Sequence, residues 1–353
     1  MTILPRLFIS LFPLFLFASS VNFKSESSVY SDKLYFDIFE GKWKSLPSNE
    51  PLNRGIALSK SELYVSDSGI EFGFGYDISG LSKINRGFIQ TWYYAQSDFD
   101  TLLKESDIGS KITDTKIYGK LNYAQYSRFF IRKVFAISNS EFKISANVLR
   151  GKQLQYMDVN GTNTPDRFVA DLRYYYTDRN LVSHNYEDDK DYYGDGFGLD
   201  LEYRFSYKKF AFFAGVYNLF GFIDWKSITY MEYHFDSQTK YVGDDGYYHY
   251  RPFGVGKYVV DTTFHQKLPV FVKYAFEYKK ELLKFGDNGL FSQGARFDEL
   301  YVGYRGLKIG YVPQSKNMIY GIYTDSFSAE ISNSLKKEHT RMIKISFEMK
   351  IKG

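Results

Sequence analysis

The chain has no cysteine, only eight prolines and, after its N-terminal segment, no long apolar run. The missing cysteines exclude disulfide scaffolds and cysteine-based zinc sites. The missing apolar runs exclude a protein that crosses a membrane with several helices. The 45 basic and 41 acidic residues are interleaved, so no basic stripe indicates a nucleic-acid partner. Aromatic residues, in contrast, make up 20% of the 353 positions, which excludes an intrinsically disordered chain.

The first 20 residues have the pattern of an export signal. Arg6 supplies the positive charge, residues 7–17 are apolar, and Ala18, Ser19 and Ser20 are small enough for a cleavage site. We expect cleavage after Ser20, which leaves residues 21–353 as one domain because no Pro-rich or low-complexity linker divides them. The alternative is a short membrane anchor, although this apolar stretch is shorter than the roughly 20 residues that a spanning helix needs.

Apolar and polar residues alternate along many segments of the remaining chain. In residues 196–207, apolar side chains fall on one face of a strand, and glycine, serine or charged residues fall on the other. Residues 70–78, 168–176, 272–279 and 343–352 repeat this pattern. Soluble strands commonly have about five or six residues, whereas a tilted strand that crosses a bilayer needs about nine to eleven. The length favours a membrane barrel, and the alternative is a secreted β-sandwich or another large soluble sheet.

The sequence therefore predicts an all-β protein, a transmembrane antiparallel up-and-down β-barrel. We expect an even number of strands between about 14 and 18, with about 16 as the best estimate. We expect residues 280–296 to form an external loop and residues 178–195 to form a linker on the periplasmic side, where long loops are unusual. The expected strands are 54–65, 69–78, 86–95, 114–125, 128–137, 141–149, 167–177, 196–207, 209–218, 226–235, 256–264, 269–279, 297–304, 307–312, 317–323, 326–332 and 341–351, with a marginal one at 33–40.

Three segments carry a resemblance to known barrels. They run from Gly215 to Trp225, from Leu268 to Tyr274 and from Leu300 to Tyr311, and they combine glycine, aromatic residues and a tight turn. Over residues 195–351 the sequence resembles bacterial outer-membrane β-barrels, loosely those of the long-chain fatty-acid transport type. The resemblance implies export to the cell outer membrane, contact with its lipid bilayer and insertion by the barrel-assembly machinery.

The polar face of the strands is expected to line the barrel lumen. Its charges have both signs, so we expect little ion selectivity from an open pore. The residues that we assign to this face are Asp200, Glu202, Arg204, Lys273, Glu277, Lys344 and Glu348.

Three function classes remain open. The favoured one is a channel or transporter for small solutes. The others are a structural or surface-interaction barrel with a plugged lumen and, less favoured, a hydrolase on the barrel rim. We expect no enzyme, because none of the five histidines has metalloprotease spacing and no Gly-x-Ser-x-Gly motif occurs.

One segment has the residue types of a calcium site. Asp158, Asn160, Thr162 and Asp166 place oxygen ligands at alternating positions near Gly161. Residue 169, where calcium loops carry a bidentate glutamate, is valine. Calcium is thus the only cofactor that we consider, and a plain hairpin loop with Asx turns explains the same residues.

Residues 236–255 form the segment richest in tyrosine, glycine and aspartate together. Such a mixture binds sugars or folds inward to narrow a lumen, and the alternative is an ordinary exposed loop. The candidate binding residues are Tyr241, Asp244, Asp245, Tyr247, Tyr248 and Tyr250.

Overall fold

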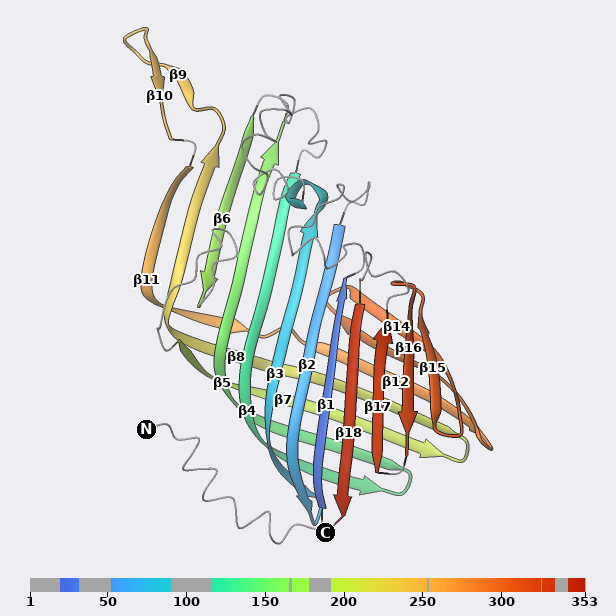
Figure 1. Cartoon of the computed structure of the whole chain (residues 1–353). Coiled ribbons are helices and arrows are strands. Elements are labelled where there is room, and N and C mark those ends of the chain that lie inside the picture. Colours follow the sequence, from blue (N-terminus) through green and yellow to red (C-terminus); the bar gives the residue numbers. More distant parts are fainter. Residues whose placement is uncertain are drawn as a thin grey trace.

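The computed structural model describes residues 20–31, 52–89, 116–164, 167–177, 192–252, 254–324, 326–333 and 342–352. Fourteen antiparallel strands form a closed ring, in which each pairs with two neighbours and β18 pairs with β1 (Figure 1). None of the helical residues in these ranges belongs to a helix long and apolar enough to cross a membrane.

In ring order the strands are β1 (Ser20–Ser31), β2 (Leu52–Asp67), β3 (Ile70–Asn85), β4 (Lys116–Ile137), β5 (Ser140–Asn163), β7 (Tyr193–Tyr207), β8 (Phe210–Asp236), β12 (Phe271–Lys280), β13 (Leu283–Ser292), β14 (Ala295–Tyr304), β15 (Leu307–Val312), β16 (Asn317–Tyr323), β17 (Phe327–Asn333) and β18 (Met342–Lys352).

Two further strands continue the wall beyond the ring. β6 (Phe168–Tyr176) lies end to end with β7, because both pair with β5 on one side and with β8 on the other. β11 (Gly254–Lys267) lies end to end with β12 along the opposite edge of β8. Together with the long strands β4, β5 and β8, they form an extension that we call the upper sheet (Figure 1).

A small hairpin projects from the end of the upper sheet, away from the ring (Figure 1). Its strands are β9 (Lys240–Val242) and β10 (Tyr248–Tyr250), which pair only with each other among the described strands. The first and last strands of the ring, in contrast, pair at the opposite end, where Ser20 faces Lys352. An up-and-down barrel with both ends on one side is the expected topology of an outer-membrane barrel.

β8 bends where it changes neighbours from β12 to β11. Asn218 and Phe220 there have φ angles of 59° and 58°, a left-handed conformation that is uncommon for residues other than glycine. The register between β7 and β8 shifts twice, between Phe197 and Leu201. Hydrogen bonds from the Asn218 side chain to Ser79 Oγ, 2.8 Å, and to the Pro269 carbonyl, 3.2 Å, hold the bend in place.

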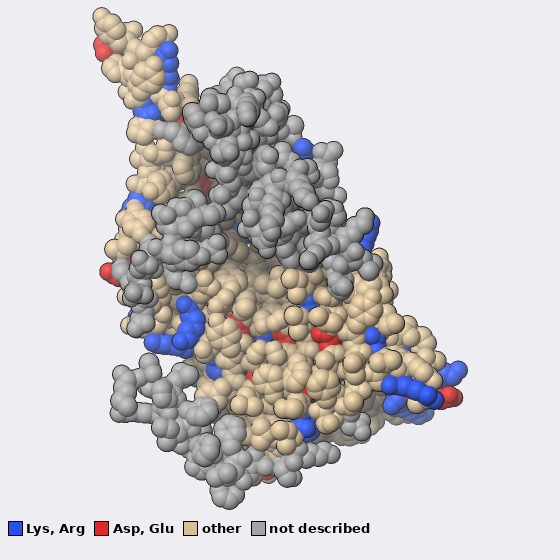
Figure 2. All heavy atoms as spheres, in the orientation of Figure 1, with Lys and Arg blue, Asp and Glu red and all other residues tan. Residues whose placement is uncertain are grey.

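The outer face of the ring is an apolar belt. On β7 it runs from Phe197 to Tyr207, both exposed, and on β18 from Ile343 to Ile351. At about 3.3 Å per residue and a tilt of about 40°, such segments span roughly 20 to 25 Å along the barrel axis, close to the height of a lipid-facing band. The outer wall seen in Figure 2 is accordingly mostly uncharged.

Charged side chains end the belt on the β5 to β11 side. A cross-strand row there consists of Arg150, Asp195, Asp224 and His265, one from each of β5, β7, β8 and β11. Arg150 pairs with Asp195 at 2.6 Å and His265 with Asp224 at 2.6 Å. The row lies directly above the exposed Val148 and Phe197, so the wall changes from apolar to charged within two residues.

The predicted all-β up-and-down barrel is confirmed, while the strand count needs a correction. The closed ring has 14 strands, within the predicted range, and the best estimate of 16 is reached only by adding β6 and β11. The linker 178–195 does not change the even number of strands in the ring. β6 and β7, which it joins, run in the same direction and together occupy a single position between β5 and β8.

Several predicted strand limits were wrong. Residues 283–292 form β13 and not an external loop, and residues 86–89 are helical and not part of a strand. The sequence patterns also missed β1 altogether. The marginal strand at 33–40 and most of the export signal lie outside the described residues.

The assignment of faces on β7 can be tested with two neighbouring substitutions. Leu201 pairs with Ile144 and Val216 on the outer face, whereas Glu202 accepts a hydrogen bond from Tyr217 inside. Leu201→Arg should cost about 2 to 4 kcal/mol near the bilayer midplane and reduce the heat-modifiable, folded fraction on gels. Glu202→Gln should leave that fraction unchanged. Equal loss in both variants would mean that the faces are assigned the wrong way round.

Candidate functional site

Buried arginines and carboxylates fill one side of the lumen, along β2, β3 and β4. The Arg128 guanidinium contacts Glu62 at 2.7 Å and Asp77 at 2.7 Å, and Arg132 contacts Glu62 at 3.0 Å and Glu71 at 2.8 Å. All five side chains are almost completely buried. They point inward because they occupy the polar positions of strands whose other face belongs to the apolar belt.

Ion pairs also connect opposite walls of the barrel. Lys273 on β12 contacts Glu26 on β1 at 2.5 Å, and these strands are seven positions apart in the ring of fourteen. A circular ring of 14 strands would be about 28 Å across, farther than one lysine and one glutamate can reach together. The ring is therefore flattened at this level, and its lumen is bridged by side chains.

Two more pairs cross the lumen between strands that are not neighbours. Lys60 on β2 contacts Asp200 on β7 at 2.6 Å, and Lys344 on β18 contacts Glu299 on β14 at 2.7 Å. Lys308 joins the second pair through Glu299 at 2.6 Å. Together with Lys273 and Glu26, these side chains form what we call the lumen latch.

An apolar layer lies next to the latch. It contains buried side chains from nine strands of the ring, and the rings of Tyr30 and Phe297 meet in it with centroids 5.4 Å apart. Its members are Tyr30, Ile56, Leu58, Tyr217, Phe271, Leu290, Ala295, Phe297, Val312, Ile319 and Met342.

The cavities are unequal in size on the two sides of the latch. A central cavity of about 40 Å³ lies between Lys60, Lys273 and Lys344 on one side and Leu58 and Phe297 on the other. Three larger cavities, of about 420, 380 and 290 Å³, lie toward the end where the strands are joined by tight turns. Side chains of the latch thus separate large cavities from a small amphipathic one.

The structure places the predicted lumen residues around these cavities. Glu202, Lys273 and Lys344 line the central cavity, and Arg204, Glu277 and Glu348 line the largest one near the latch. Asp200 is buried and bonded to Lys60 and to the backbone amide of Asn218. Their partners Glu26, Lys60 and Glu299 were not predicted, because each lies on a strand far away in the sequence.

Three of the four residues proposed for calcium lie in a strand and not in a loop. Asp158, Asn160 and Thr162 belong to the end of β5, where Asp158 pairs with Lys120 at 3.3 Å and accepts a hydrogen bond from Asn160. Asp166 lies outside the described residues. In the described part of the chain, no group of three or more acidic or histidine residues is placed to hold a metal ion. Calcium binding at this segment stays a prediction.

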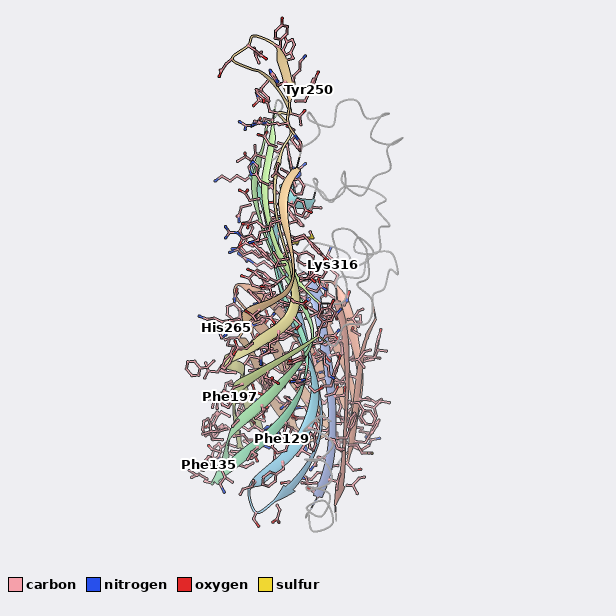
Figure 3. All side chains as sticks on the ribbon, turned by 90° about the vertical axis from the view of Figure 1, so that its left-hand side faces the viewer. Phe129, Phe135, Phe197, Tyr250, His265 and Lys316 are labelled. Carbon is pink, nitrogen blue, oxygen red and sulfur yellow. The ribbon has the colours of Figure 1, made fainter. Side chains whose placement is uncertain are left out.

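The tyrosine-rich hairpin does not fold into the lumen. Its candidate residues lie at the far end of the upper sheet, as the position of Tyr250 in Figure 3 shows. Tyr241, Tyr247, Tyr248 and Tyr250 are exposed. Lys240 Nζ lies 3.7 Å from the centre of the Tyr248 ring, and His249 contacts Asp245 at 2.9 Å. The predicted constriction is wrong, while binding by Asp244, Asp245 and the tyrosines stays a prediction.

A buried carboxylate fixes the base of the hairpin. Asp236 accepts hydrogen bonds from Arg167 at 2.8 and 3.0 Å and from Arg251 at 2.6 Å. The hydrogen bond from Arg167, followed by that from the Gln238 amide, lowers the pKa of Asp236 well below its usual range. A two-stranded hairpin is marginal in water, so these contacts are what keeps it ordered.

The contacts of Asp236 with Arg167 and Arg251, which we call the clamp, can be tested by proteolysis. Asp236→Asn should raise the rate of trypsin cleavage after Lys240 by roughly fivefold, because the charge-assisted hydrogen bonds are lost. The pKa of Asp236 is lower in the folded protein than in the unfolded chain. The clamp therefore stabilises the hairpin at all pH values above the usual aspartate range, and this stabilisation is lost only as the pH falls through the folded pKa. Wild-type protection should therefore be equal at pH 8 and pH 5.

Asp244→Asn is the matched control, since it makes the same chemical change within the hairpin but away from the contacts of Asp236 at its base. Mass spectrometry of the fragments measures both variants. Equal cleavage of the two variants would contradict the role of Asp236.

Known proteins have only a weak similarity to this chain. No known family and no curated protein matches the sequence. Among solved structures, the toluene transporter TodX of P. putida is 9% identical over 94% of this chain and 88% of its own, with a TM-score of 0.39. A Pseudomonas aeruginosa FadL homologue is 8% identical over 94% of this chain and 86% of its own, with a TM-score of 0.35. The outer membrane protease OmpT of Escherichia coli is 10% identical over 95% of this chain and 97% of its own, with a TM-score of 0.28. These values assign neither substrate nor activity to this chain.

Proposed function

We propose that the protein is an outer-membrane barrel that admits small solutes through its lumen, and that the lumen latch closes this route in the present conformation. The proposal rests on the way in which the lumen is closed, which is by side chains and not by a plug domain or a loop among the described residues. Within the described residues, opposite walls meet through side chains, above all through Lys273 and Glu26, with large cavities on one side of them.

The location follows from the outer surface. A lipid-facing band of about the right height surrounds the ring, and it ends at the charged row of Arg150, Asp195, Asp224 and His265. We place the tight-turn end, where both described termini lie, in the periplasm, and the upper sheet outside the cell.

A closure made of ion pairs can open without moving the barrel wall. Lysine and glutamate side chains rotate about several single bonds, and the large cavity next to the latch offers space for them beside Glu277, Tyr301 and Glu348. Breaking a buried pair is costly unless each charge finds water or a new partner. The many neighbouring charges of both signs supply such partners.

The lining of the central cavity fits solutes with both polar and apolar parts. Lys60, Lys273 and Lys344 provide donors, and Leu58 and Phe297 provide apolar contact. Because Glu26 and Glu202 lie beside the lysines in the same cavity, the fields of the two signs offset each other. We therefore expect weak ion selectivity and leave the solute unspecified.

Conductance of the protein in planar bilayers tests the proposal. The double variant Glu26→Ala with Lys273→Ala should conduct at least roughly threefold more than the wild type, because the pair that bridges opposite walls is removed while both charges disappear together. Heat-modifiability on gels shows that the variant is folded.

The matched control removes an ion pair of the outer face. Arg150→Ala with Asp195→Ala deletes an exposed contact of 2.6 Å and should leave the conductance at the wild-type level. If the folded latch variant conducts no better than this control, and neither conducts, the barrel is a plugged structural or surface-interaction protein.

A further inference from the structure

The upper sheet has two chemically different faces. One face is apolar and buried, with Met157, Leu172, Tyr174 and Met231 packed together and Phe88 against them. The other face carries polar and charged side chains from the same five strands. Figure 3 shows the upper sheet nearly edge-on, with side chains that carry nitrogen and oxygen atoms projecting to its left.

A row of alternating charges crosses the polar face. Each strand contributes one residue that faces its neighbour in register, and the pairs Lys120 with Asp158 and Arg173 with Glu232 are both 3.3 Å apart. The row consists of Lys120, Asp158, Arg173, Glu232 and Lys257.

The next row outward adds hydrogen-bonding groups. Asn160 faces Asp171, and Asp171 faces His234, with 2.8 Å between Asp171 Oδ1 and His234 Nδ1. Across the two rows, three cations, Lys120, Arg173 and Lys257, balance the three carboxylates of Asp158, Asp171 and Glu232. A face with no net charge and many donors and acceptors suits a ligand that is polar but uncharged.

An aromatic cluster forms the adjoining row on the same face, on the side of the ring. The rings of Tyr156, Tyr175 and Tyr230 come from three neighbouring strands in register, and Phe264 of β11 stacks on Tyr175 with centroids 4.1 Å apart. Tyr230 lies 4.5 Å from Tyr175. Burial, then the hydrogen bond with Glu232, raises the pKa of Tyr230 to about 12, so its hydroxyl remains a donor at neutral pH.

The polar residues enclose a groove. It has a volume of about 520 Å³ and is lined by Asp158, Asn160, Arg173, Glu232 and His234, among others. Small-molecule sites typically measure about 300 to 1,000 Å³, so the groove is of the size that holds one small ligand.

We propose that this groove is a binding site for a neutral saccharide at the cell surface. Sugar rings present hydroxyl groups at their edges and C–H groups on their faces. The paired carboxylates and amide of the groove can bind the hydroxyls. Tyr156 and Tyr230, which lie in the row beside the groove, can contact the C–H face. Tyr175 lies between them and holds the row together, because it stacks with Phe264 and contacts Tyr230. Because Lys120 and Arg173 are already paired with Asp158 and Glu232, a charged ligand that bound these four side chains would have to break their ion pairs.

A glycan array followed by calorimetry tests the site on the full-length protein in detergent. The probes are neutral oligosaccharides of glucose, galactose, mannose and N-acetylglucosamine, with sialylated and sulfated glycans beside them. Wild type should bind members of the neutral set, and Tyr175→Ala should weaken the binding by roughly tenfold through loss of the central ring.

Two further variants separate loss of the site from loss of the fold. Asn160→Ala removes a groove amide and should also weaken binding, whereas Tyr207→Ala removes an exposed tyrosine at the tight-turn end of β7 and should not. Heat-modifiability checks each variant. Preference for the charged glycans, absence of binding to every neutral glycan, or wild-type binding by folded Tyr175→Ala and Asn160→Ala would overturn the proposal.

Discussion

Lys273 of β12 and Glu26 of β1 meet in the middle of the barrel although their strands stand on opposite sides of the ring. This contact sets the shape of the lumen, because a circular barrel of 14 strands would keep the two side chains apart. The pairs Lys60 with Asp200 and Lys344 with Glu299 repeat the bridge at other points. Charges that leave water on folding stabilise a structure only when they are paired. The barrel walls therefore approach each other until each of these charges has a partner.

The wall of the barrel also explains why the protein extends so far beyond its apolar belt. At two positions in the wall, two strands lie end to end where a single strand would otherwise run: β6 with β7, and β11 with β12. Both positions are next to the same long strand, β8. The bend at Asn218 and Phe220 lets β8 turn from the ring into the upper sheet. One continuous sheet thus carries an apolar outer face at the level of the belt and a polar groove beyond it.

The sequence was sufficient to predict the fold class and the faces of single strands. In β7, Asp200, Glu202 and Arg204 alternate with apolar residues over a long segment, and such a pattern indicates a strand with one polar and one apolar face. It was insufficient for β1, because Ser25 and Ser27 occupy outward positions where apolar residues were expected. These serines bond instead to Ser61 and Ser59 of β2, at 2.8 and 2.6 Å. The hydroxyl groups of β1 thus find their hydrogen-bond partners on a neighbouring strand, and the sequence of β1 alone does not reveal this strand.

The same limit applies to β13 and to the site. Asp287 and Gly289 take outward positions in β13 and hide its alternation. For the latch, the sequence identified Lys273 as facing the lumen but not Glu26 as its partner, since the two are 247 residues apart. Contacts across a lumen depend on ring closure and flattening, which no local pattern encodes.

Exchange of the two charges tests most directly whether Glu26 and Lys273 face each other across the lumen. The measurement is the temperature at which the heat-modifiable band is lost, for Glu26→Lys, for Lys273→Glu and for the double variant. Each single variant places two like charges at the contact and should lower this temperature by several degrees. The double variant should recover most of the loss because the pair is restored with its charges reversed. If the double variant is as unstable as the sum of the two single variants, the residues do not interact and the lumen is not bridged there.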